Sequence, residues 1–179
     1  MITVLILGLF ALVMLVVLLR VVHGQNVAVS GLEELAGRTR PVDLEAFRNL
    51  TDPREEEYLK AQLAPADFRA LQRERFRAAL GYVQRVAHNA SILLRVGEAA
   101  RRNPDPEVAR AAGELVESAL DLRMHALLAV GMLRARILFP EARWSPVRLV
   151  ADYQRVRDRV ARLSRLQRPE YAGHISAAL

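Results

Sequence analysis

The chain has no cysteine among its 179 residues, which excludes a disulfide framework, a thiolate metal site and a cysteine nucleophile. It also lacks a Gly-x-Ser-x-Gly elbow and a glycine-rich phosphate loop, the motifs that expose a nucleophile or cradle a phosphate. No segment alternates apolar and polar residues as a half-buried strand does. We therefore predict an all-α protein that is not an enzyme, with no catalytic residue and no cofactor.

Lysine is nearly absent too, because Lys60 is the only lysine among the 26 basic residues. We interpret this ratio as the mark of a GC-rich genome. The net charge is +6, and residues 141–168 hold eight arginines against Glu141, Asp152 and Asp158. The rest of the chain is nearly neutral, so the basic character belongs to the last predicted helix.

One long apolar run is present at the N-terminus. Ile2 to Leu19 carries no charge, and after Arg20 the run continues to His23. A helix of about 20 residues spans roughly 30 Å, the thickness of a hydrocarbon core. Arg20 lies near the end of this helix, where a long side chain can extend to the headgroups. We predict a single-pass transmembrane anchor over residues 1–23.

A cleavable signal peptide is the alternative, since Val22 and Gly24, or Ala28 and Ser30, fit a small-x-small cleavage pattern. However, no basic residue precedes the apolar run, and the run is longer than the ~7–15 residues of a signal core. These two features favour an uncleaved anchor.

The flanks of the run predict its orientation. No lysine or arginine lies before it, whereas Arg20, Arg38 and Arg40 follow. Positive charges favour the cytoplasmic side, so we expect the C-terminal domain in the cytoplasm, beside the inner membrane of a bacterium. A periplasmic domain is the alternative.

Proline, glycine and capping residues divide the remainder into a linker (24–41), a helical bundle domain (42–168) and a flexible tail (169–179). Asp43, Asp52 and Asp105 are N-caps, and Asp52-Pro53 begins a helix that ends at about Leu63. Apolar steps of three and four predict a long helix over 65–102, and Asn103-Pro104-Asp105-Pro106 turns the chain into a second one over 106–138. So short a turn forces an antiparallel hairpin in an elongated up-down bundle.

A last helix is predicted between Ser145-Pro146 and Pro169, with Leu149, Tyr153, Val156, Val160 and Leu163 as its buried seam.

The helix over 106–138 is apolar on two faces. Its second face carries Leu120, Met124 and Leu127, so it needs cover on both sides. It is either the central helix of the bundle or part of an interface with a protein partner or a second copy. It is not a membrane span, because its longest uncharged stretch is about ten residues.

His88, Asp121 and His125 are candidate metal ligands, because folding the hairpin about Pro104 brings them toward one another. The alternative is an ordinary pair on a helix surface, since Asp121 precedes His125 by four residues. The Glu-x-x-His pattern of di-metal bundles is absent, which favours the surface pair.

Arg148, Arg155, Arg159 and Arg162 share one flank of the last helix. Such a basic flank can meet anionic lipid headgroups or an acidic protein. Nucleic acid is disfavoured, because no stacking aromatic residues interleave. The alternative is a solvated face on which Asp152 pairs with Arg155 and Asp158 with Arg162.

These features predict a membrane-anchored interaction or scaffold protein. The alternatives are an extracytoplasmic sensory or ligand-binding bundle and, with less support, a metal-dependent enzyme.

A reporter fused after Leu179 tests the orientation. We expect a reporter that works only in the cytoplasm to be active in this fusion, because the positive charges follow the anchor. Activity confined to a periplasm-specific reporter would contradict the cytoplasmic assignment and favour the extracytoplasmic bundle.

Overall fold

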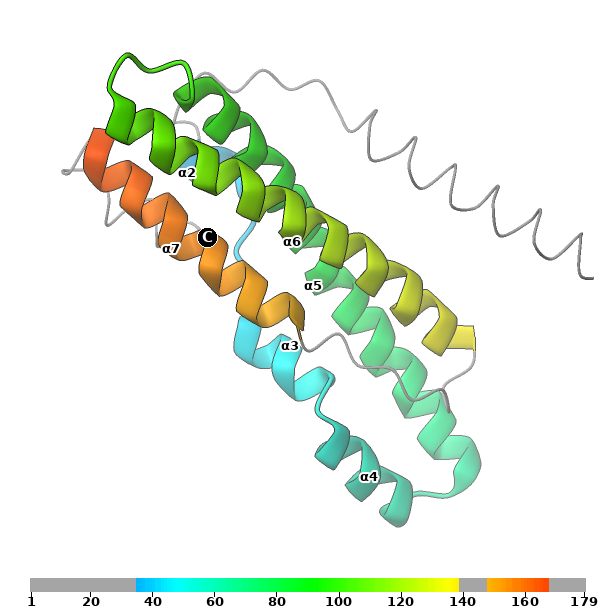
Figure 1. Ribbon diagram of the computed structural model, residues 1–179. Coiled ribbons are helices and arrows are strands. Elements are labelled where there is room, and N and C mark those ends of the chain that lie inside the picture. The colour runs from blue at the N-terminus through cyan, green and yellow to red at the C-terminus, as the bar shows by residue number, and fades with distance from the viewer. Residues whose placement is uncertain (1–34, 139–147, 168–179) are drawn as a thin grey trace, which may run out of the picture.

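The computed structural model describes residues 35–138 and 148–167, and these residues form helices without a strand (Figure 1). The helices are α2 (Leu35–Arg38), α3 (Leu44–Leu50), α4 (Pro53–Gln62), α5 (Pro65–Ala100), α6 (Pro106–Leu138) and α7 (Arg148–Gln167). The predicted all-helical bundle is therefore confirmed for this part of the chain. The predicted anchor with Ile2, Leu19 and Arg20, and the predicted tail, lie outside it.

Within the described ranges, no helix combines the length and the apolar character that crossing a bilayer requires.

The predicted capping residues begin the helices. The Asp43 carboxylate accepts hydrogen bonds from the first backbone amides of α3, and Asp52 accepts from the Arg54 amide at 2.9 Å. Asp105 accepts from the Glu107 amide at 2.8 Å at the start of α6. Each cap satisfies an amide that has no partner inside the helix, so local chemistry alone fixes these boundaries.

The centre of the fold is the antiparallel hairpin of α5 and α6, which Figure 1 shows as two long helices lying side by side. The two helices approach each other closely at Gly97. A Cβ atom added there would lie 2.7 Å from Cγ2 of Val116, closer than packed carbons tolerate. Glycine at position 97 therefore permits the close packing of the hairpin near its turn.

Helix α7 packs on α6 through the predicted seam. Leu149, Tyr153, Val156, Val160 and Leu163 are each at most 3 % exposed. Helices α2, α3 and α4 pack instead on α5, and Figure 1 shows α3 and α4 continuing the line of α7. The last residues of the predicted linker are thus part of the bundle, because α2 and Arg40 contact α5.

One buried amide joins three parts of the chain. Asn89 in α5 has no exposed surface, and its Nδ2 donates to the Arg40 carbonyl at 2.7 Å and to the Tyr153 hydroxyl at 2.9 Å. Its Oδ1 accepts from the Arg40 amide at 2.8 Å. A buried polar group with all of these bonds made holds the chain before α3, α5 and α7 in one arrangement.

Replacing Asn89 with alanine is expected to lower the free energy of unfolding by about 2–3 kcal/mol, because it leaves the Arg40 backbone groups and the Tyr153 hydroxyl without this partner. Chemical denaturation of the two proteins measures the difference. Asn49→Ala is the control, because the Asn49 side chain is exposed and its loss should cost under about 0.5 kcal/mol. Equal losses in the two variants would contradict the role assigned to Asn89.

Candidate functional site

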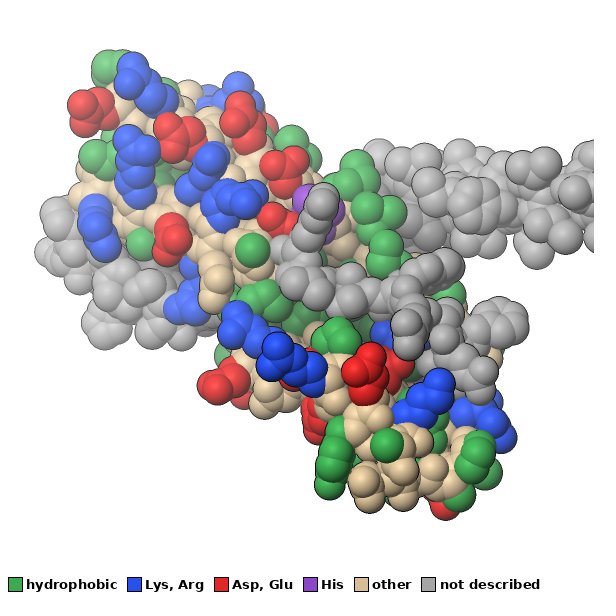
Figure 2. All heavy atoms as spheres, turned by 60° about the horizontal axis from the view of Figure 1, so that its bottom comes forward, with side chains coloured by type: hydrophobic (Ala, Val, Ile, Leu, Met, Phe, Trp, Pro, Cys, Tyr) green, Lys and Arg blue, Asp and Glu red, His purple; other side chains and the backbone are tan. Residues whose placement is uncertain are grey.

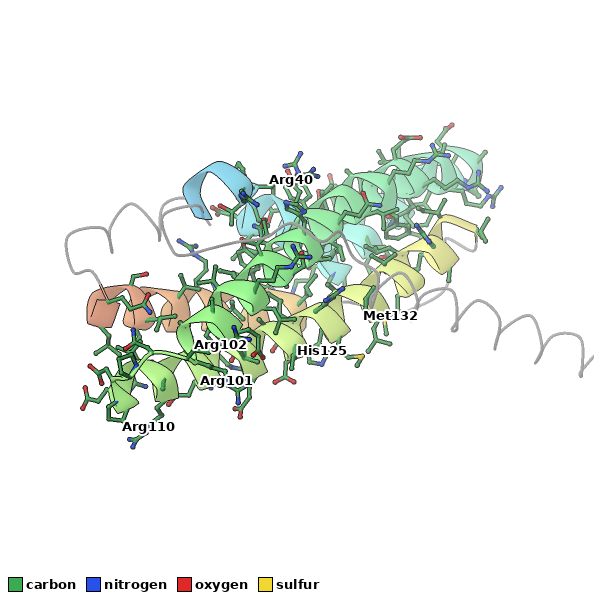
Figure 3. The ribbon with its side chains drawn as sticks, turned by 90° about the horizontal axis from the view of Figure 1, so that it is seen from above. Arg40, Arg101, Arg102, Arg110, His125 and Met132 are labelled. Atoms are coloured by element: carbon green, nitrogen blue, oxygen red, sulfur yellow. The ribbon has the colours of Figure 1, made fainter. Side chains whose placement is uncertain are left out.

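Five of the eight exposed large hydrophobic residues in the described part of the chain lie on α6. Leu120, Met124, Leu128 and Met132 are 49, 58, 50 and 36 % exposed. Residues four apart stand in line on a helix, so these four side chains form one continuous row. We call it the α6 ridge. Figure 3 shows Met132 on the side of α6 that faces away from α5.

A second row of residues, which stands lower than the ridge, runs beside it. Leu127, Gly131 and Ala135 follow one another in steps of four, and we call this row the α6 groove. Leu127 and Ala135 are half-buried, and a Cβ atom added at Gly131 would meet nothing within 4 Å. On its other side the groove is bordered by Arg134 and by Leu138, which is 71 % exposed. The α6 groove is therefore open, and its walls are mostly apolar.

The three residues that the sequence predicts for an interface differ in exposure. Leu120 and Met124 are exposed, whereas Leu127 is half-buried and lies in the groove. Leu128 and Met132 were not predicted. The reason is geometric, because the expected steps of four and three follow a coiled-coil seam, whereas the exposed row advances by four throughout.

Two arginines lie close together at the start of the groove row. The pKa of Arg123 is lowered from its ordinary value, chiefly because the side chain is partly buried and also because the Arg95 guanidinium of α5 repels its charge. Arginine stays charged in proteins in spite of such shifts. Two basic side chains therefore lie at this end of the groove.

The three candidate metal ligands occupy different surroundings. His88 Nε2 lies 3.0 Å from the Arg38 carbonyl oxygen, and Asp121 is exposed. Nδ1 of His125 lies 2.7 Å from Oδ2 of Asp152 in α7. Among the described residues, no three His, Asp or Glu side chains come together closely enough to hold a metal ion. The structure does not bring the predicted set together.

Sequence reasoning missed Asp152 as the neighbour of His125. Asp152 is only 7 % exposed, and its Oδ1 also lies 3.2 Å from Nη1 of Arg155. Its position directly before the seam residue Tyr153 was the available sign that it borders the α6–α7 contact. The pair joins α7 to α6 at the edge of their apolar seam.

The predicted basic flank is largely engaged within the bundle. Arg159 donates to the Glu114 carbonyl oxygen, and Arg162 Nη1 donates to Oε2 of Glu114 at 3.0 Å. The expected Asp152–Arg155 pair is present, but the expected Asp158–Arg162 pair is wrong, because α6 offers Arg162 a carboxylate. The Arg148 side chain lies outside the described residues.

The surface charges of this face are mixed. Figure 2 shows basic and acidic side chains intermingled over one end of the molecule, and hydrophobic side chains gathered beside a histidine. A face on which both signs alternate has a weak net field. The apolar surface of α6 is thus a stronger candidate site than the basic flank.

No family model, curated protein or solved structure matches this chain.

Burial raises the pKa of the Tyr153 hydroxyl above its ordinary value, and this effect outweighs the lowering by the Asn89 hydrogen bond and by the Arg157 charge. Tyr153 therefore contributes a pH dependence to stability. Below a pH of about 10 the phenol is neutral in both the folded and the unfolded chain. Above it the unfolded chain loses the proton first, so stability falls until the pH passes the folded pKa.

We expect Tyr153→Phe to reduce the loss of stability between a pH of about 9.5 and 11.5, since this variant has no phenol to ionise at that site. Unfolding midpoints measured across this range give the slope. Tyr58→Phe is the control, because Tyr58 is 64 % exposed. If Tyr153→Phe keeps the full slope of the parent protein, buried Tyr153 does not cause it.

Proposed function

We propose that this protein is a membrane-anchored interaction subunit without catalytic activity, in which residues 1–23 hold the helical bundle at a bilayer. The α6 ridge and α6 groove are its binding surface for a protein. The exposed row from Leu120 to Met132 carries this proposal. The largest contiguous apolar patch on a domain is often a functional binding site.

The composition of the surface supports a protein as the ligand. The centre of a protein interface is depleted in charge and enriched in large apolar side chains such as methionine. The ridge and the groove together hold two methionines and three leucines and no charged residue. Methionine also adapts its shape to a partner more readily than branched residues do.

The anchor is supported by the uncharged run from Ile2 to Leu19. The basic flank contributes less than its sequence suggests, since Arg155, Arg159 and Arg162 each bind a group of the bundle itself. Anionic headgroups therefore remain a secondary partner in this proposal, and the apolar face of α6 is the primary contact.

Photo-crosslinking in native membranes tests the binding surface. We expect a photoreactive amino acid at Met124 of the full chain to form adducts with protein, because this position lies in the ridge. The control is the same amino acid at Tyr58, which is more exposed than Met124 (64 against 58 %) but lies on α4. If exposure alone determined the yield of adducts, Tyr58 would give more adducts than Met124.

Two outcomes would overturn the proposal. Adducts with lipid alone at Met124 would mean that the ridge lies in the bilayer. Release of the full chain from the membranes by alkaline extraction would show that residues 1–23 do not anchor it.

A further inference from the structure

The α6 ridge and the α6 groove are complementary to each other. The ridge is a row of large side chains in steps of four, and the groove beside it contains Gly131 and Ala135 in the same steps. Two helices whose rows of this kind interdigitate cross at an angle of about 50°. Each α6 then presents a ridge to the groove of the other, as a two-fold symmetric contact requires.

We propose that the α6 face binds a second copy of this chain, so that the protein is a dimer joined by packing of α6 on α6. This inference rests on the proposed function in two respects, since it identifies the protein partner of the same surface and takes the bilayer anchor from that proposal.

The area of the face agrees with a dimer. From the exposed fractions of the ridge and of Leu138, each copy offers on the order of 500 Å² of apolar surface, at the upper end for the largest patch of a monomer. Two such faces would bury about 1,000 Å² in total, which is the lower limit for a specific interface. The bilayer anchors raise the effective concentration of the copies, so a contact of modest area suffices.

The shape of the face favours protein over lipid. A bilayer has no side chains to fill the groove at Gly131, whereas the ridge of a second copy does. The charges beside the face have both signs, because the exposed Asp121 carboxylate borders the ridge and the exposed Arg134 borders the groove. They therefore do not favour an anionic bilayer over a protein.

Because the chain has no natural cysteine, single cysteines can report the contact. We introduce Leu128→Cys into the full chain and treat native membranes with a short bismaleimide. We expect a covalent dimer with twice the chain mass. Tyr58→Cys is the control for random collision, because it is exposed and lies on α4, outside the α6 ridge and groove. Met124→Cys is the second reporter if Leu128→Cys does not accumulate.

A variant that fills the groove distinguishes dimerisation from the binding of any other partner. Gly131→Leu places a large side chain where a second ridge would enter, and the open space at position 131 accommodates it in the monomer. In the Leu128→Cys background we expect it to lower the dimer yield by about tenfold or more, equal to about 1.4 kcal/mol of contact free energy. The matched control is Gly81→Leu, because Gly81 in α5 is equally open and should leave the yield unchanged.

Each outcome decides between the proposals. Equal dimer yields from Leu128→Cys and Tyr58→Cys, or a yield that Gly131→Leu leaves intact, would overturn the dimer. Adducts from Met124 with a different protein would overturn the dimer but leave the binding function standing. Lipid adducts alone would overturn both. Circular dichroism of Gly131→Leu must show the parent's helix content, since an unfolded variant would lose the dimer for another reason.

Discussion

The structure depends on the packing of α5 against α6. Residues 65–100 and 106–138 form an antiparallel hairpin whose facing side chains, such as Leu93, Leu115 and Leu122, are completely buried. Each buried leucine contributes roughly 1.5–3 kcal/mol, so this contact supplies most of the stability of the bundle. Every other described element packs on the hairpin. Its orientation therefore decides which surface of α6 remains for a partner.

Polar groups then determine how the outer elements lie on the hairpin. The hydrophobic effect is not directional, whereas the Asn89 amide requires the Arg40 backbone and the Tyr153 hydroxyl in one geometry. The position of helix α4 depends on polar groups even more, because none of its side chains is buried. Two nearly buried arginines hold it: Arg75 lies 2.9 Å from Glu55, and Arg136 lies 2.7 Å from Glu56.

Arg136 also stacks over the Phe76 ring, with its guanidinium carbon 4.3 Å from the ring centroid. Glu56 offsets part of the cost of removing this guanidinium from water, so its loss would cost more than the loss of a surface ion pair. The position of α4 on the bundle thus results from the need to neutralise these charges and not from the burial of apolar side chains.

The local part of this fold could be predicted from the sequence. Asp43, Asp52 and Asp105 cap helices because carboxylates bind the amides that follow them, and the Leu149–Leu163 seam is buried because its steps match a helix face. The cross-chain contacts could not be predicted. The partners of Asn89 are 49 and 64 residues away, and nothing in the neighbourhood of a single mid-helix asparagine identifies them.

The candidate site was predicted only in outline for a related reason. Two apolar faces on one helix indicate that both need cover, but the sequence does not reveal which side chains the neighbouring helices reach. In the folded chain Leu127 is half-buried, whereas its neighbour Leu128 is 50 % exposed. A shift of one residue on a helix is a rotation of about 100°, enough to exchange a groove position for a ridge position.

The glycines of α5 and α6 give the strongest argument that the α6 groove has a partner. A glycine inside a helix is about 1 kcal/mol less favourable than alanine. At Gly97 the fold itself explains this cost, because a Cβ atom would collide with Val116. At Gly131 packing within the bundle does not explain the cost, because no atom lies within 4 Å of an added Cβ. Gly81 and Gly113 are equally open, so openness alone does not distinguish Gly131. The position of Gly131 between the exposed ridge and Leu138 distinguishes it. Of these open glycines, only Gly131 lies where an added side chain would obstruct an apolar surface that the bundle leaves uncovered.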